Sequence, residues 1–370
     1  MDRRQVLAYR IAEHGLHRST RDVADLAVVR AGLQDSMRDT ALLAAVARAS
    51  SVSPESLVDD ERLVLAWTLR GAPHYHRRSD LAEVTRALIP LDDADALARM
   101  LWQRKELAAT GLAAAEVVFT AATALRKVVT SEMTKGAVST AVTKLVPPEF
   151  SRWCRGCNAT HIHEQLMRIA APLGGIRLVA GATPATLAPL EGRGRMRTKP
   201  DAPAATSVVE SYLRLNGPAS PGDAAEFVGT ARAVVDRTWP ADLAEVRVDG
   251  KVRYLPAACL PSLENPPEPD VVRLLPPWDP FIQARDKALL VPDPARRKEV
   301  WKMLGNPGVL LAEGDIAGTW RTKASGTKLV FTLTPFGPLR PASREAAEAE
   351  AALVAKARGF AKHDVTWSVS

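Results

Sequence analysis

Gln34, Asp35 and Ser36 place an amide, a carboxylate and a hydroxyl together at the end of an aliphatic stretch. A glutamine can orient a water molecule, and a carboxylate can accept the proton that an attacking water loses. Gly32 is typical of a helix end, so we expect these side chains at a turn before the next helix. Alternatively, Asp35 and Ser36 only cap that helix.

Two basic segments are candidates for contact with a polyanion. The first is His74-Tyr75-His76-Arg77-Arg78, and the second is 193–199, in which arginines alternate with other residues. The glycine in the segment 193–199 would let the backbone approach a phosphate. A solvated linker explains this segment equally well. We expect loops in both places, with polyanion contacts from Arg70, His74, His76, Arg77, Arg193, Arg195 and Arg197.

Cys154, Cys157, His161 and His163 are of the residue types that bind zinc. All four fall within 154–163, and such compact spacing would strain a tetrahedral site. The alternative is that the two cysteines flank a helix start capped by the segment 158–160. We therefore expect no metal and no other cofactor, with zinc as the alternative.

The composition is that of a globular protein with a large core. The chain has 370 residues, 46% of them hydrophobic and 25% charged, and a formal net charge of +7. This excess favours binding to a polyanion but also fits an ordinary basic protein. Three cysteines indicate a reducing compartment, and we see neither a secretion signal nor a membrane span. We expect a cytoplasmic protein that does not contact membranes.

Short helices followed by β-structure are predicted three times along the chain. The first set has helices at 3–14, 21–31 and from near Arg38 to Ala49, with a strand at 63–69; a further helix is expected at about 93–104. The second set has helices at 112–131, 137–145 and 162–171 and a strand at 176–180. The third has helices ending at Asn216, at 221–229 and at 230–238, then a hairpin around Asp249-Gly250. Three helices and a hairpin form the winged-helix plan, which usually reads DNA.

The remainder is a Pro- and Glu-rich linker at 261–270, alternating runs at 309–312, 316–322 and 328–334, and a final helix at 342–358. The predicted fold class is α+β, mainly α: tandem winged-helix (helix-turn-helix) units plus a small C-terminal antiparallel sheet. The expected division is 1–110, 111–190, 200–260 and 270–370.

Several motifs in order along almost the whole chain resemble the AlkZ/YcaQ family of bacterial winged-helix DNA glycosylases. They are the segments 32–36, 67–74, 248–250, 273–281 with Arg285-Asp286, and Gly318-Thr319-Trp320-Arg321. The resemblance implies tandem winged helices that bind DNA. It also implies hydrolysis of the N-glycosidic bond of alkylated purines, including bulky genotoxin adducts.

The catalytic motif of that family is a glutamine, any residue, then glutamine or aspartate. Gln34 matches its first position, but Ser36 occupies the second, so Asp35 is the other candidate for the catalytic carboxylate. His74 matches the histidine of a second motif, in which Ala72 replaces a threonine; it either binds the sugar-phosphate or is a buried structural residue. We expect Trp320 to lie in the core, and leave the role of Trp278-Asp279 open.

The resemblance implies a monofunctional DNA glycosylase for repair of alkylation damage or antibiotic self-resistance. It would act as a monomer on double-stranded DNA, with Gln34 and Asp35 positioning water. The alternatives are a winged-helix DNA-binding protein without catalysis and a resistance protein that sequesters a toxin.

Overall fold

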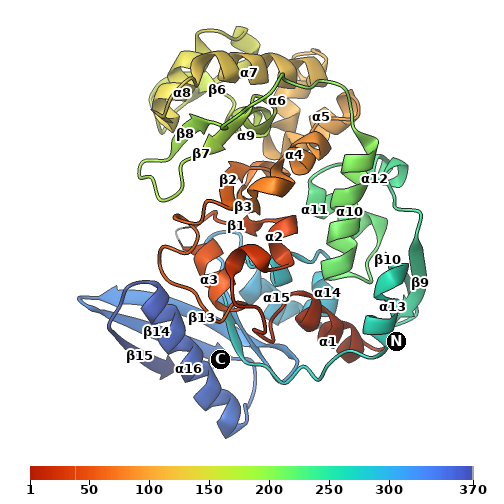
Figure 1. The fold of residues 1–370 in the computed structure, drawn as a ribbon, viewed down its shortest axis with the longest axis vertical. Coiled ribbons are helices and arrows are strands. Elements are labelled where there is room, and N and C mark those ends of the chain that lie inside the picture. The colour runs from red at the N-terminus through yellow and green to blue at the C-terminus, as the bar shows by residue number, and fades with distance from the viewer. Residues whose placement is uncertain (38, 369–370) are drawn as a thin grey trace. The chain divides into compact units, whose positions relative to one another are not determined.

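The computed structural model describes residues 1–37 and 39–368. The chain forms two compact units that interleave along the sequence. Unit 1 comprises 1–60, 211–223 and 241–370, and unit 2 comprises 61–210 and 224–240. Two of the four boundaries fall inside helices, which are α10 (Ala202–Asn216) and α11 (Pro221–Val228) (Figure 1).

The N-terminal part of unit 1 is helical. Its elements are α1 (Arg3–Glu13), the 3-10 turn η1 (Val23–Asp25), α2 (Val28–Ala31), the short strand β1 (Leu33–Gln34) and α3 (Thr40–Val46). The prediction of α1 is confirmed, and Asp2 caps it by accepting from the Gln5 N–H at 2.8 Å. The single helix predicted at 21–31 is wrong, because η1 and α2 are separate turns. The predicted start of the next helix, Arg38, lies outside the described residues.

A β-hairpin and a short helix complete the middle of unit 1. They are β9 (Leu243–Val248), β10 (Lys251–Pro256), η5 (Ala257–Cys259) and α13 (Leu260–Glu264). Asp249 and Gly250 both have positive φ, at 48° and 78°, as a type I′ turn requires. The hairpin prediction is confirmed, whereas the linker predicted from 261 begins with α13.

The C-terminal part of unit 1 is a five-stranded sheet in the order β11-β12-β13-β14-β15. Its elements are β11 (Arg273–Leu275), η6 (Pro280–Gln283), α14 (Lys287–Leu290), α15 (Pro294–Val300), β12 (Gly308–Ala312), β13 (Asp315–Ser325), β14 (Lys328–Pro335), α16 (Pro341–Ala357) and β15 (Lys362–Trp367). The three predicted strands are confirmed. Two more were missed, and β15 pairs parallel to β14, so the antiparallel prediction is wrong at this edge.

The first part of unit 2 is a hairpin followed by helices. Its elements are β2 (Leu63–Trp67), η2 (Leu69–Gly71), β3 (Pro73–Arg77), α4 (Arg78–Ala87), α5 (Asp93–Arg99), η3 (Leu101–Gln103) and α6 (Arg104–Ala108). The strand prediction at 63–69 is confirmed. The single helix predicted at 93–104 is wrong, because Leu101 adopts a positive φ of 47° and interrupts it.

The rest of unit 2 alternates helices with short strands. Its elements are α7 (Ala114–Val128), β4 (Met133–Thr134), α8 (Lys135–Thr143), η4 (Pro148–Phe150), β5 (Ser151–Cys154), β6 (Ala159–Ile162), α9 (Glu164–Leu173), β7 (Ile176–Leu178), β8 (Thr186–Pro189) and α12 (Arg232–Arg237). Strands β4, β8 and β7 form one sheet, and β5 pairs with β6. The helix start predicted around Cys154 and Cys157 is therefore wrong; a hairpin occupies this segment.

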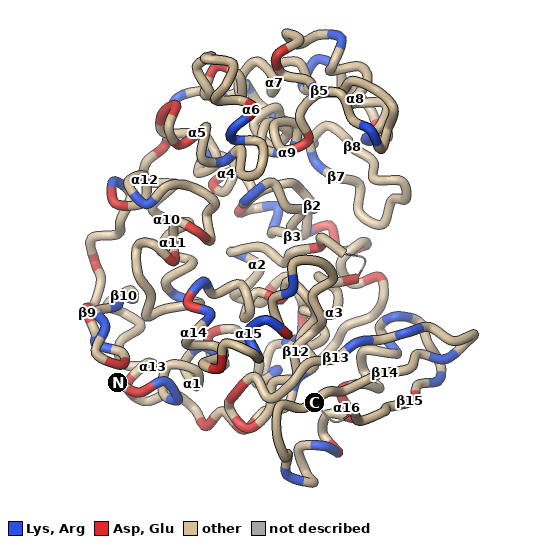
Figure 2. Tube along the Cα trace, turned by 180° about the vertical axis from the view of Figure 1, so that it is seen from behind, with Lys and Arg blue, Asp and Glu red and all other residues tan. Residues whose placement is uncertain are grey.

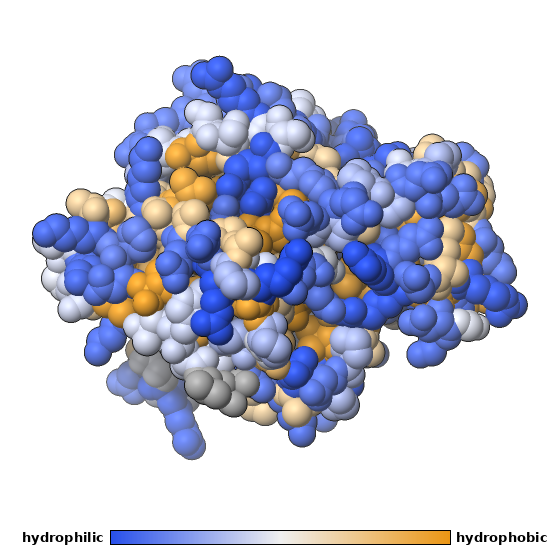
Figure 3. All heavy atoms as spheres, turned by 90° about the horizontal axis from the view of Figure 1, so that it is seen from below, coloured by the Kyte–Doolittle hydropathy of each residue, from blue (hydrophilic) through white to orange (hydrophobic). Residues whose placement is uncertain are grey.

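The molecule is thus a mixed helical and β protein with a five-stranded C-terminal sheet. Basic and acidic residues are interspersed along the trace in Figure 2, so the net positive charge is not confined to one element. Polar residues cover most of the face in Figure 3, with apolar residues in patches between them. No helix among residues 1–37 and 39–368 is long and apolar enough to cross a membrane.

Candidate functional site

Gln34 and Ser36 form a hydrogen-bonded pair at the end of β1. The Gln34 amide Nε2 donates to Ser36 Oγ at 2.8 Å. Gln34 is buried and Ser36 is exposed, so the pair joins the interior of unit 1 to its surface. β1 ends at Gln34 and Ser36 lies in the bend that follows, so the chain turns the Ser36 hydroxyl back to the Gln34 amide.

Asp35 points instead toward the start of α3. Its Oδ1 accepts the backbone N–H of Ala41 at 3.1 Å and lies 3.5 Å from Thr40 Oγ1. Burial raises the pKa of Asp35, and the charge of Asp39 raises it further, against the opposing Ala41 N–H. Asp35 therefore accepts a backbone N–H in the first turn of α3, but the N-cap residue of this helix is Asp39, so the prediction that Asp35 and Ser36 cap it is wrong. The side chain of Asp35 is half-buried.

Thr40 joins the two parts of this cluster, a role that the sequence did not indicate. Its hydroxyl oxygen lies 3.0 Å from the carbonyl oxygen of Gln34 and 2.9 Å from that of Met37. A threonine six positions after Gln34 follows no periodic pattern, so no local signal could have identified it.

The helix that follows this cluster is held by a buried ion pair. Arg48 donates to both carboxylate oxygens of Asp279, at 2.6 and 2.7 Å, and both side chains are fully buried. Arg48 also donates to the carbonyl oxygens of His14 and Ala44. Asp279 is therefore a structural residue of unit 1, buried in its core.

The tryptophans of the family-like motifs differ in environment. Trp320 is buried, as predicted, and its indole N–H donates to the Leu275 carbonyl oxygen at 2.9 Å. Trp278 is half-buried and adopts a positive φ of 66°, next to the buried Asp279.

His74 and His76 lie in β3, not in the predicted loop, and both are buried. Thr68 Oγ1 lies 2.9 Å from His74 Nδ1 and 3.0 Å from His76 Nε2, so it bridges the two rings. Burial lowers the pKa of His74 well below its usual range, with Arg70 and His76 adding to the effect. His74 is therefore neutral at pH 7, as a buried structural histidine would be.

The two arginines beside this hairpin are engaged within unit 2. Arg70 has a positive φ of 59°, donates to the Phe227 carbonyl oxygen and lies over the Phe227 ring. Arg77 forms an ion pair with Asp80 at 3.1 Å. Arg70 lies in the η2 turn between β2 and β3, whereas Arg77 ends β3 and does not lie in the predicted loop.

The segment 193–199 is irregular, as predicted, but its arginines do not share one environment. Arg193 is anchored on α7, because its guanidinium donates to the carbonyl oxygens of Val129 and Arg126. Its side chain also packs beside Gly175, where an added Cβ would lie 3.1 Å from the Arg193 Cβ. Arg195 and Arg197 are exposed. The alternation therefore separates one anchoring arginine from two surface arginines.

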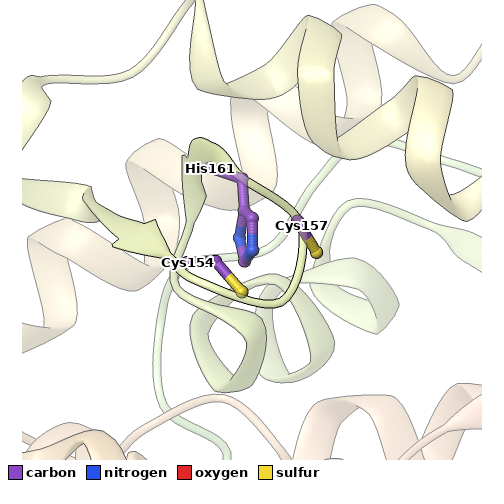
Figure 4. A group of neighbouring side chains, drawn as sticks. All are labelled: Cys154, Cys157 and His161. Carbon is purple, nitrogen blue, oxygen red and sulfur yellow. The ribbon is translucent and has the colours of Figure 1, made fainter.

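Cys154, Cys157 and His161 converge at the tip of the β5–β6 hairpin (Figure 4). A hydrogen bond with His161 lowers the pKa of Cys154 to about 7, and the pKa of Cys157 is raised by its hydrogen bond with Cys154. His163 is elsewhere: it is buried at the start of α9, with Nδ1 3.1 Å from the Gln103 amide nitrogen. The four candidate ligands thus reduce to three.

The fold is similar to that of one solved structure over the whole chain. It is similar to the solved structure of Streptomyces sahachiroi DNA glycosylase AlkZ, with a TM-score of 0.77 and 21% sequence identity. The similarity covers 100% of both chains. Comparison with curated proteins finds no match.

The family profile described as "DNA glycosylase AlkZ-like" matches residues 23–357. The chain belongs to this AlkZ-like DNA glycosylase family, as its motifs led us to expect. Membership supports DNA glycosylase activity and a role in DNA repair, with DNA as the substrate.

Proposed function

We propose that the protein hydrolyses the N-glycosidic bond of alkylated purines in double-stranded DNA. The observation that carries this proposal is the hydrogen-bonded pair of Gln34 and Ser36 beside the half-buried carboxylate of Asp35. In this proposal Gln34 and Ser36 hold the attacking water. Asp35 stabilises the developing positive charge on the sugar and accepts the proton of the water.

The single carboxylate of the motif favours a leaving group that is already charged. Glycoside hydrolysis with a neutral leaving group ordinarily uses two carboxyl groups, one of which donates a proton. A purine alkylated at N7 or N3 is cationic and leaves without that proton. The next carboxylate along the chain, Asp39, is ion-paired with Arg358 at 3.8 Å, which favours a structural role for it.

Asp35 also gives specific support to a second candidate, a DNA-binding protein without catalysis. Its Oδ1 already accepts the Ala41 N–H at the start of α3, and Ser36 lacks both the charge of aspartate and the amide of glutamine. A protein with this motif could bind a lesion and leave the bond intact.

The proposal extends to architecture and surroundings. We propose that the helical sets and their hairpins act as winged-helix units within the regions 1–110, 111–190 and 200–260, followed by 270–370. The exposed Arg195 and Arg197 are the best candidates for phosphate contacts. Three free cysteines fit a monomer that works in the reducing cytoplasm.

The test is base release from duplex DNA containing N7-alkylguanine, measured under single-turnover conditions. We expect Gln34→Ala to lower the rate by at least about 100-fold, the usual contribution of a positioned catalytic group. Ser36→Ala should lower it about 10-fold, because a single hydrogen bond to the amide is lost. Binding to the same DNA should change little in either variant.

Ser325→Ala, at the exposed end of β13, is the matched control and should keep the full rate. If the unchanged protein binds the damaged duplex but releases no base, the second candidate is correct. If Gln34→Ala retains full activity, the water is held elsewhere.

A further inference from the structure

The tip of the β5–β6 hairpin gathers three potential metal ligands that the glycosylase reaction does not use. Cys154 ends β5 and pairs in register with Ala159, the first residue of β6. The chain then turns back through Cys157, helped by Asn158, whose φ is 49°. His161 follows on β6, and Figure 4 shows its ring between the two cysteines.

The distances suit a small tetrahedral ion. The sulfur atoms of Cys154 and Cys157 and a ring nitrogen of His161 all lie within 4.8 Å of one another. With Zn–S near 2.3 Å and Zn–N near 2.0 Å, tetrahedral ligands must stand about 3.5–3.8 Å apart. The cluster therefore needs to contract by about 1 Å, which rotation of the exposed Cys157 side chain can supply.

The surrounding hydrogen bonds orient two of the ligands. The backbone N–H groups of Gly156 and Cys157 donate to the sulfur of Cys154, as in Cys-x-x-Cys metal sites where amides stabilise a thiolate. His161 Nδ1 lies 2.9 Å from the Ile162 carbonyl oxygen. An Nδ1–H donated there leaves the lone pair on Nε2, which is the nitrogen that then binds a metal.

Four ligands within ten residues would strain a tetrahedral site. His163 lies apart from the other three, so the site has only three protein ligands and this strain does not arise. Three ligands leave the fourth vertex of the tetrahedron to water, which the exposed hairpin can provide. We propose that Cys154, Cys157 and His161 bind one zinc ion, with water as the fourth ligand. The ion fixes the turn of the hairpin, on which Arg152, Trp153 and Arg155 are exposed.

Metal binding is tested on the full chain, stripped with a chelator and kept reduced, by titration with Co²⁺ and then Zn²⁺. We expect one equivalent of Co²⁺, with a thiolate-to-metal charge-transfer band that Zn²⁺ abolishes. Cys154→Ser and Cys157→Ser should lose the band, and His161→Gln should bind at least about 10-fold more weakly. Cys259→Ser and His363→Gln, which change the same residue types outside the cluster, should bind like the unchanged chain.

A second readout follows the hairpin itself. Arg155 lies in the turn between the two cysteines, so trypsin cleavage after Arg155 reports whether the turn is fixed. Zn²⁺ should slow this cleavage by at least about 10-fold in the unchanged chain and not in Cys157→Ser. Equal melting temperatures of the two metal-free proteins will show that the variant is folded.

Two outcomes would overturn the proposal. One is the absence of stoichiometric Co²⁺ or Zn²⁺ binding by the reduced chain, or binding that survives in the Cys154→Ser/Cys157→Ser double variant. The other is a Cys154–Cys157 disulfide that persists in the presence of reductant, which would make the pair a redox element instead. Neither outcome bears on base release, so the zinc site and the glycosylase activity can fail separately.

Discussion

Ser36 stands where the family motif has aspartate or glutamine. Its hydroxyl oxygen accepts a hydrogen bond from the Gln34 amide. Glutamine at this position would have a longer side chain with separate donor and acceptor groups, and it would add no charge next to Asp35 and Asp39. We expect Ser36→Gln to raise the single-turnover rate of base release about 10-fold.

The measurement for Ser36→Gln is the excision rate at saturating protein, alongside Ser325→Gln as the control. An unchanged rate in Ser36→Gln would mean that this position does not hold the water. A lower rate would mean that the shorter serine is adapted to this active site.

Asp35 makes a prediction about pH. Its pKa is raised by burial, so it ionises above the ordinary aspartate value of 3.8. A base must be ionised to act, so the rate should fall about 10-fold per pH unit below this raised pKa. In Asp35→Asn the residual rate should no longer fall at low pH. A pH profile of single-turnover excision measures this acidic limb of the rate. A limb that persists in Asp35→Asn belongs to another group.

Arg48 and Asp279 make a prediction about stability. Both side chains are fully buried, so removing one partner leaves an unpaired charge in the interior. We expect Arg48→Met to lower the free energy of unfolding by about 3–5 kcal/mol. Arg48→Met/Asp279→Leu should recover part of this loss, because it buries no charge. Urea denaturation measures both variants, and equal losses would show that the arginine contributes through its packing instead.

At the scale of elements, the arginines of the segment 193–199 have two different roles: Arg193 anchors the segment on α7, and we expect the exposed Arg195 and Arg197 to bind DNA. Arg195→Ala/Arg197→Ala should weaken DNA binding and reduce the slope of log affinity against log salt by about 1.8, for two phosphate contacts. Arg193→Ala should leave this slope almost unchanged, because its guanidinium is bonded to α7. Binding titrations between low and moderate salt measure the slopes.

Lys323→Ala/Lys362→Ala, which removes two exposed charges from β13 and β15, is the matched control for charge. If it reduces the salt slope as much as Arg195→Ala/Arg197→Ala does, the segment 193–199 has no special role in binding.

Short sequence patterns predicted the hairpin and the strands that depend only on neighbouring residues. Asp249-Gly250 specified its hairpin, and the strands β12 to β14 followed from alternation. The strand β15 was missed because a polar sequence, Lys362-His363-Asp364, alternates with few apolar residues at this edge of the sheet. The helix at 21–31 was overpredicted, because periodicity does not reveal that Leu26 takes an extended backbone.

The grouping of Gln34, Asp35 and Ser36 follows from the sequence, but the hydrogen bonds among them do not. A turn is expected at this place from Gly32, and a bend follows β1, but the sequence does not indicate that this bend brings the Ser36 hydroxyl to the Gln34 amide. A loop is predicted for His74 and His76 because they follow the first apolar run, although their spacing of two suits one face of a strand. The partner of Arg48 is 231 positions away, and no spacing rule covers such a distance.

For the whole molecule, buried histidines predict acid sensitivity. Burial lowers the pKa of both His14 and His74 well below 6.5. As pH falls below about 6.5 the unfolded chain takes up protons that the folded chain refuses, so stability is present above this pH and lost below it. Each residue should contribute a slope of up to about 1.4 kcal/mol per pH unit.

Urea denaturation at pH values between 7.5 and 5.5 measures this slope. His74→Gln should have the smaller slope, and His363→Gln, whose side chain is not buried, should keep that of the unchanged chain. A pH-independent stability in this range would contradict the prediction.

The interleaving of the units also orders events during protein synthesis. Arg10 in α1 pairs with Asp286, which the ribosome adds 276 residues later, and unit 2 is fully translated before β11 exists. Domains ordinarily fold as they emerge. Here the first 60 residues must instead wait as a nascent chain while unit 2 folds behind them, exposed to chaperones and proteases until the C-terminal sheet is made.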